Sequence, residues 1–159
     1  MTFNRLIFLA WLAASLIPIL LVVSYQNSMA SPTSLRICSS FERDQYATNS
    51  SGEIWYVASD SMSPQLTIGD VVAVDKNVNF DDIRIDEIIV FKEPVPDEDE
   101  ANAIISRVNE ILTDPRDDIV FLTKGDANSG SIPGVDFPIY ENNFIGIVRC
   151  FLEEGQFKR

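Results

Sequence analysis

The chain has 159 residues, of which 46% are hydrophobic, with a formal net charge of −12 at pH 7 and no histidine. This length supports one domain of moderate size together with an appendage. The acidic balance argues against nucleic-acid binding, which depends on basic patches, and against electrostatic docking on anionic lipid.

The N-terminal stretch is long, apolar and uncharged. Residues 6–23 contain no charged side chain, and a helix needs roughly 17–25 apolar residues to cross a hydrocarbon core. Arg5 precedes the run and the next basic residue is Arg36, so the positive-inside rule places the N-terminus in the cytoplasm and the remainder outside. We therefore expect residues 1–25 to be a transmembrane anchor in the lipid bilayer. The alternative is a secretory signal cleaved near Ala30, and both readings export the domain.

Residues 26–52 are polar and rich in Ser, Thr and Asn, and we predict a membrane-proximal linker with a candidate short strand at residues 35–38. The two cysteines, Cys38 and Cys150, lie near the two ends of the part predicted to fold. In an exported domain they can pair and tie these ends together. Two unpaired thiols are the alternative.

From residue 53 onward, short β-branched and aromatic segments alternate with turn signals. They predict strands at residues 54–58, 71–75, 87–92, 103–112, 119–123 and 144–148. The acidic, proline-containing residues 93–100 are expected to form an exposed loop. No convincing amphipathic helix follows the anchor, so residues 53–159 are predicted to form a mostly β domain.

A serine-rich turn follows the first predicted strand of this domain. Its sequence is Ser59-Asp60-Ser61-Met62-Ser63-Pro64-Gln65-Leu66, which we call the serine motif, and Gly69-Asp70 and another strand come next. A serine at the end of a buried strand, beside small residues and backbone N–H groups, can act as a nucleophile with an oxyanion hole nearby. An ordinary serine-rich turn is the competing interpretation.

The serine motif resembles the nucleophile box of type I signal peptidases, Ser-Gly-Ser-Met-x-Pro-x-Leu. The resemblance implies that Ser61 is the nucleophile and that Met62 belongs to the substrate-binding site. Asp60 stands where the family usually has glycine, which places a charge and a Cβ beside the nucleophile. A second segment, Phe121-Leu122-Thr123-Lys124-Gly125-Asp126-Ala127-Asn128, resembles the family's Phe-x-Thr-Lys-Gly-Asp-x-Asn box in its archaeal and endoplasmic-reticulum form. We call it the TKGD motif.

In that branch of the family a histidine is the general base, and aspartates assist it. The resemblance matches Asp126 to the first aspartate and Asp136 to the second, with a spacing wider by a few residues. At the base position relatives read His-Arg-Val, or Lys-Arg-Val in bacteria, whereas this chain reads Ser106-Arg107-Val108. A serine hydroxyl, with a pKa far above neutrality, cannot serve as a general base.

The segment at residues 87–92 resembles the family strand that lines the substrate cleft, and residues 143–148 resemble its closing strand. We therefore expect an extended peptide to add as a strand beside the cleft residues, with small side chains entering apolar pockets. These residues are Ile88, Ile89, Val90 and Phe91.

The resemblance covers most of residues 55–148 and implies a signal-peptidase-like β domain behind a single N-terminal transmembrane helix. It implies a cell-membrane serine endopeptidase, without metal or cofactor, whose extracytoplasmic domain removes signal peptides from exported preproteins. In this reading Ser106 relays a proton to Lys92, Lys124 or a carboxylate, and a lysine would need burial to act as a base. One alternative is an inactive relative that binds extended peptides or acts as an accessory subunit. The other is an exported β domain with only structural duties.

Overall fold

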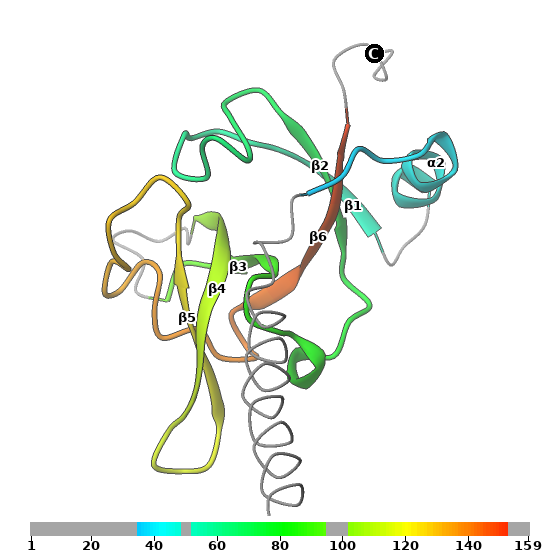
Figure 1. The fold of residues 1–159 in the computed structure, drawn as a ribbon. Helices are drawn as coiled ribbons and strands as arrows, with labels where there is room; N and C mark the ends of the chain where they lie inside the picture. The colour runs from blue at the N-terminus through cyan, green and yellow to red at the C-terminus, as the bar shows by residue number, and fades with distance from the viewer. Residues whose placement is uncertain (1–34, 49–51, 95–101, 153–159) are drawn as a thin grey trace, which may run out of the picture. The chain divides into compact units, whose positions relative to one another are not determined.

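The computed structural model describes residues 35–48, 52–94 and 102–152 (Figure 1). Among these residues, no helix has the length and apolar character required to cross a membrane. The anchor predicted at residues 6–23 lies outside the described ranges.

Most of the described chain belongs to one six-stranded sheet with the order β1-β2-β6-β3-β4-β5. All neighbouring strands are antiparallel, and Figure 1 shows β4 and β5 as a long hairpin. The prediction of a mostly β domain is confirmed. The strands are β1 (Gly52–Tyr56), β2 (Val71–Asp75), β3 (Ile88–Lys92), β4 (Ala103–Thr113), β5 (Ile119–Lys124) and β6 (Phe144–Leu152).

β3 lies inside the sheet. It pairs with β4 on one side and with β6 on the other. A strand with two neighbours has no free row of N–H and C=O groups to offer an incoming peptide. A peptide therefore cannot pair with the backbone of β3 itself, and the substrate-binding role expected of Ile88, Ile89, Val90 and Phe91 stays a prediction.

The side chains of β3 build the core on both faces of the sheet, since successive residues point to opposite faces. Ile88 and Val90 belong to one cluster and Ile89 and Phe91 to another. This is why the strand reads as a continuous apolar run and not as an alternating one. The first cluster also contains Val57, Met62, Leu66, Val72, Val74 and Val148, and the second contains Phe80, Ile83, Val108, Phe121, Ile139 and Ile147.

Helix α2 (Ser40–Thr48) lies within residues 26–52, the predicted membrane-proximal linker, where the sequence analysis expected no helix. The helix has no buried residue and therefore no apolar stripe for a periodicity argument to detect. A capping box starts it: Glu42 N–H donates to the Ser39 hydroxyl at 3.2 Å, and Ser39 N–H donates to the Glu42 carboxylate at 3.0 Å. The Ser-x-x-Glu spacing is the sequence signal that predicts such a helix start.

A disulfide joins Cys38 to Cys150 across a sequence separation of 112. It decides between the paired and unpaired alternatives left open by the sequence. Two backbone hydrogen bonds lie beside the disulfide. Cys38 N–H donates to the Phe151 carbonyl at 2.8 Å, and Phe151 N–H donates to the Arg36 carbonyl at 3.0 Å. The residues just before α2 are thus fastened to β6 and belong to the folded domain.

Candidate active site

Ser61 lies in the turn that connects β1 to β2. Met62 beside it is only 1% exposed and packs in the first core cluster. At the base of this connection, Val57 N–H donates to the Asp70 carbonyl and Gly69 N–H to the Val57 carbonyl, both at 2.9 Å. Gly69 has a φ of 93°, a left-handed conformation that favours glycine. Packing and backbone bonds thus hold the turn while Ser61 remains partly accessible.

The TKGD motif packs directly on Ser61. Ala127 N–H donates to the Ser61 carbonyl at 2.9 Å. A Cβ added to Gly125 would lie 2.6 Å from the same carbonyl oxygen, closer than real Cβ atoms approach. The absence of a side chain at Gly125 therefore permits the contact. Two motifs far apart in the sequence meet at the candidate nucleophile.

The Ser61 hydroxyl forms a hydrogen bond with the Ser59 hydroxyl, with 3.1 Å between the two oxygens, and either group can donate. Within the described ranges, the Ser61 side chain makes no other hydrogen bond. No described amine or carboxylate hydrogen-bonds to it. A neighbouring hydroxyl can orient Ser61, but it is not a base of the strength that serine activation needs.

The structure brings Ser106 together with Asp136. Both are buried, at 1% and 3% exposure. The Ser106 hydroxyl donates to Asp136 Oδ1 at 3.5 Å, and Ile132 N–H donates to Oδ2 at 2.9 Å. Burial raises the pKa of Asp136, while these hydrogen bonds and the charge of Lys124 act in the opposite direction. Despite the wider spacing in the sequence, Asp136 therefore lies in hydrogen-bonding contact with Ser106, the residue at the predicted base position.

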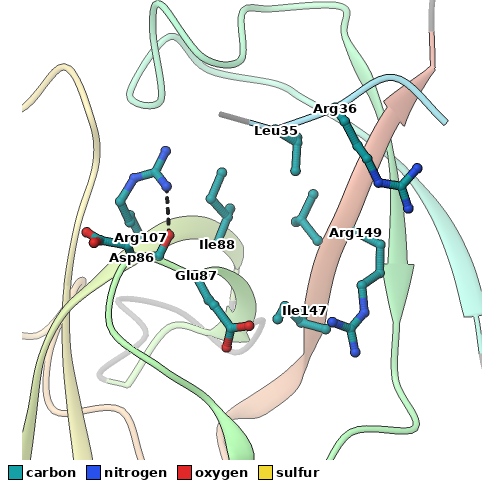
Figure 2. Close-up of a pocket in the computed structure, with 9 residues that line it drawn as sticks. Leu35, Arg36, Asp86, Glu87, Ile88, Arg107, Ile147 and Arg149 are labelled. Atoms are coloured by element: carbon teal, nitrogen blue, oxygen red, sulfur yellow. Dashed lines mark hydrogen bonds between the residues drawn. The ribbon is translucent and has the colours of Figure 1, made fainter. Parts of the chain in front are cut away.

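Asp126 is engaged elsewhere. It forms a two-point ion pair with Arg107, with Nε to Oδ1 at 2.7 Å and Nη2 to Oδ2 at 2.6 Å. The hydrogen bond to Asp126 also raises the pKa of Arg107. The third donor, Arg107 Nη1, binds the Asp86 carbonyl at 2.7 Å, the dashed line in Figure 2. Because both Asp126 oxygens are used, this residue braces β4 against the TKGD motif.

The two lysines proposed as bases occupy different environments. Lys124 Nζ donates to the carbonyls of Gly125 and Asn128 at 3.2 and 3.0 Å, and so closes the turn of the TKGD motif that packs on Ser61. Lys92 is exposed at the end of β3, so the burial that a lysine base requires is not present there. Neither amine contacts the Ser61 hydroxyl in the described structure.

A groove of about 130 Å³ includes Ser61 in its wall. Part of its lining comes from the first half of β4, which pairs with β3 on one side. Pairing with β5 begins only at Arg107, so residues 103–106 have no partner strand on their other side among the described residues. The sequence singled out Ser61 and Met62 of this lining, but it did not distinguish Ala103, Ile104 and Ile105 from core residues, because they are apolar. The groove is lined by Trp55, Tyr56, Val57, Ala58, Ser59, Ser61, Met62, Ala103, Ile104 and Ile105.

A second pocket, of about 240 Å³, gathers arginine side chains near the start of β3 (Figure 2). Arg36 pairs with Glu42, Arg107 with Asp126 and Arg149 with Asp75. Their charges are therefore balanced, and the pocket has no evident excess of positive charge to attract an anion. Neither Ser61 nor Ser106 lines this pocket. It is lined by Leu35, Arg36, Asp86, Glu87, Ile88, Arg107, Ile147, Val148 and Arg149.

The described ranges contain no group of three or more His, Cys, Asp or Glu side chains arranged to hold a metal ion. No protein-family model matches the chain, and no curated protein matches it either. The motifs and the geometry around Ser61 therefore carry the functional inference.

Proposed function

We propose that this chain is a membrane-anchored serine endopeptidase of the signal peptidase I type, which removes signal peptides from exported preproteins. The observation that carries the proposal is the docking of the TKGD motif on the serine motif through the Ala127 N–H and the Ser61 carbonyl, at 2.9 Å. The resemblance predicts that these two motifs share one site. The approach of Ser106 to Asp136 adds support, since the resemblance predicts the base position and the second aspartate to be neighbours.

The substrate in this proposal is an extended peptide that lies between residues 55–59 and the free side of β4. A strand edge facing a second extended segment suits recognition by β-augmentation. The volume of about 130 Å³ and the apolar walls favour small, uncharged side chains next to the scissile bond. In this proposal the peptide lies beside β4, whose free side borders the groove, and not along the backbone of β3.

Cleavage requires Ser61 to lose its proton and attack the peptide carbonyl carbon. In the proposed reaction, the Ser61 hydroxyl turns from Ser59 toward Ser106 when substrate binds, and Ser106 passes the proton to Asp136. Burial raises the pKa of Asp136, so its carboxylate is a better proton acceptor than an ordinary aspartate. The proton then returns to the leaving amine as the C–N bond breaks, as in other serine peptidases.

A second candidate function is peptide binding without cleavage, as an inactive relative or an accessory subunit. The observation that favours it is the contact of the Ser61 hydroxyl with another hydroxyl, with no described amine, imidazole or carboxylate in hydrogen-bonding distance. The groove does not depend on the missing base, so binding would survive the loss of catalysis.

The test compares variants of the full chain, purified in detergent, on an exported preprotein. An active enzyme should cleave it, and Ser61→Ala should lose that cleavage by on the order of 10³-fold or more. Ser63→Ala, which removes a hydroxyl from the same turn, is the matched control and should remain active. Ser106→His supplies an imidazole beside Asp136 and should raise the rate.

The same variants separate the two candidates. An inert wild type with an active Ser106→His variant would establish an inactive peptide-binding protein on an intact scaffold. If both are inert while circular dichroism shows them folded, the peptidase proposal is wrong.

A further inference from the structure

Lys124 ends β5, and its amine folds back over the turn that follows. The Nζ atom donates to the Gly125 carbonyl at 3.2 Å and to the Asn128 carbonyl at 3.0 Å, so one cation joins the two ends of the turn. The backbone closes the same turn, because Asn128 N–H donates to the Gly125 carbonyl at 2.9 Å. Between these ends, Ala127 N–H donates to the Ser61 carbonyl at 2.9 Å. The lysine therefore fixes the turn that binds the backbone of the candidate nucleophile.

The place of this lysine in the sheet is electrostatically unfavourable. Lys124 pairs with Arg107 of β4 in the strand register, so two positive side chains lie opposite each other. Like charges in that arrangement are destabilising. Arg107 has Asp126 as its counter-ion, whereas Lys124 forms no ion pair with any residue of the described ranges. A side chain that breaks a local rule in this way is expected at a functional site.

The uncompensated charge of Lys124 acts on Asp136, the proton acceptor in the proposed reaction. Thr123, the residue before the lysine, donates its backbone N–H to the Asp136 carbonyl at 3.1 Å, which holds this end of β5 against the loop. The Ser106 hydroxyl and the Ile132 N–H donate to the carboxylate. Burial raises the pKa of Asp136, and these hydrogen bonds and the charge of Lys124 lower it. Among these described groups, Lys124 alone carries a charge.

We propose that Lys124 is a positioning residue for cleavage, which holds the Ser61 backbone through the turn and keeps the Asp136 carboxylate ionised so that it can accept the proton. This inference rests on the proposed function, because it assigns a part in the same reaction. The role differs from that of a base, since the amine is engaged with two carbonyls and does not contact the Ser61 hydroxyl. A carboxylate accepts a proton only in its ionised form, so loss of the cation should narrow the pH range in which the enzyme works.

The test follows preprotein cleavage by the full chain in detergent as a function of pH. Lys124→Met removes the hydrogen bonds and the charge, and should lower kcat on the order of 10- to 100-fold by misplacing Ser61. KM should change little, because Lys124 does not line the substrate groove. The acid limb of the kcat/KM profile should move to higher pH, since Asp136 then keeps its proton to higher pH.

Three further variants separate the charge from the hydrogen bonds and from general effects. Lys124→Gln keeps an amide donor without the charge, and should move the acid limb as Lys124→Met does with a smaller loss of kcat. Lys124→Arg keeps the charge and should return the limb to its wild-type position. The matched control is Lys76→Met, which removes the same charge from a lysine that is 36% exposed and paired with Glu53 at 3.2 Å. It should leave kcat and the acid limb unchanged.

Folded Lys124→Met and Lys124→Gln variants with a wild-type acid limb would overturn the role of Lys124 and leave the peptidase proposal intact. An acid limb that stays displaced in Lys124→Arg would also overturn it, because the charge would then not be the cause. A folded wild type that leaves the preprotein uncut would overturn the proposed function and this inference together.

Discussion

The hydroxyl of Ser106 donates to the carboxylate of Asp136 across 3.5 Å, and both side chains are almost inaccessible to solvent. The contact ties β4 to the loop between β5 and β6. A second tie comes from Thr123, whose backbone N–H and hydroxyl both donate to the Asp136 carbonyl, at 3.1 and 2.9 Å. Ser106 and Asp136 thus form a small, buried polar pair between β4 and this loop.

The first prediction concerns the pH dependence of stability at Asp136. Burial raises the pKa of this carboxyl in the folded state above its ordinary value of 3.8. Below pH 3.8 the group is protonated in both states, and as the pH rises through the folded pKa the folded state loses stability. Asp136→Asn cannot ionise, so its free energy of unfolding should improve relative to wild type across that window and then level off.

Urea unfolding from about pH 3 to pH 7 measures this difference. Ser106→Ala gives an independent check, because the Ser106 hydrogen bond lowers the pKa of Asp136. Its removal should extend the loss of stability to higher pH. A constant difference between Asp136→Asn and wild type at all pH values would contradict the prediction.

The second prediction tests the close approach of the TKGD motif to Ser61. Gly125→Ala places a Cβ 2.6 Å from the Ser61 carbonyl oxygen, so backbone must shift. Overpacking of this kind costs about 1–3 kcal/mol. Gly130→Ala is the matched control, since a Cβ there meets nothing within 4 Å. Thermal unfolding should show a clearly lower stability for Gly125→Ala than for Gly130→Ala. Equal unfolding temperatures for the two variants would refute the contact.

The third prediction concerns the ion pair between Arg107 and Asp126, whose side chains are 12% and 17% exposed. Asp126→Asn leaves a largely buried guanidinium without its carboxylate and should lower the free energy of unfolding by about 3 kcal/mol. Arg116→Gln breaks a pair with Asp114 in which the arginine is 70% exposed, and should cost less than about 1 kcal/mol.

A double variant completes this comparison. Arg107→Met with Asp126→Asn removes both charges and should be less damaging than Asp126→Asn alone, because no unpaired charge remains. Additive losses in denaturant unfolding would show that the two side chains act independently.

The fourth prediction concerns the disulfide between Cys38 and Cys150, which closes a loop with a sequence separation of 112. Because long loops lose the most entropy on cross-linking, the double replacement by alanine should lower stability by about 4 kcal/mol. Replacing either cysteine alone should lower the stability by nearly as much, because a single cysteine cannot form the disulfide. Guanidinium unfolding of oxidised and reduced wild type provides the comparison, and identical midpoints would argue against the bridge.

Local features of the fold could be predicted from the sequence because their causes are local. β-branched runs such as the one in β2 and in β3 favour strands, and the turns around Ser61 and Gly125 are marked by Ser, Pro, Gly and Asp. The start of helix α2 could also have been predicted, because Ser39 and Glu42 have the spacing of a capping box. It was missed because its exposed, polar surface has no apolar period.

The tertiary structure alone decided which distant residues meet. It placed β3 between two neighbours, left the first half of β4 without a partner strand in the described chain, and paired Cys38 with Cys150. It also gave the two aspartates different partners: Asp126 forms an ion pair with Arg107, and Asp136 accepts a hydrogen bond from Ser106. The physical reason is that strand order and register are set by the burial of whole faces of a sheet. A local pattern specifies which face of a strand is apolar, but not which strand lies beside it.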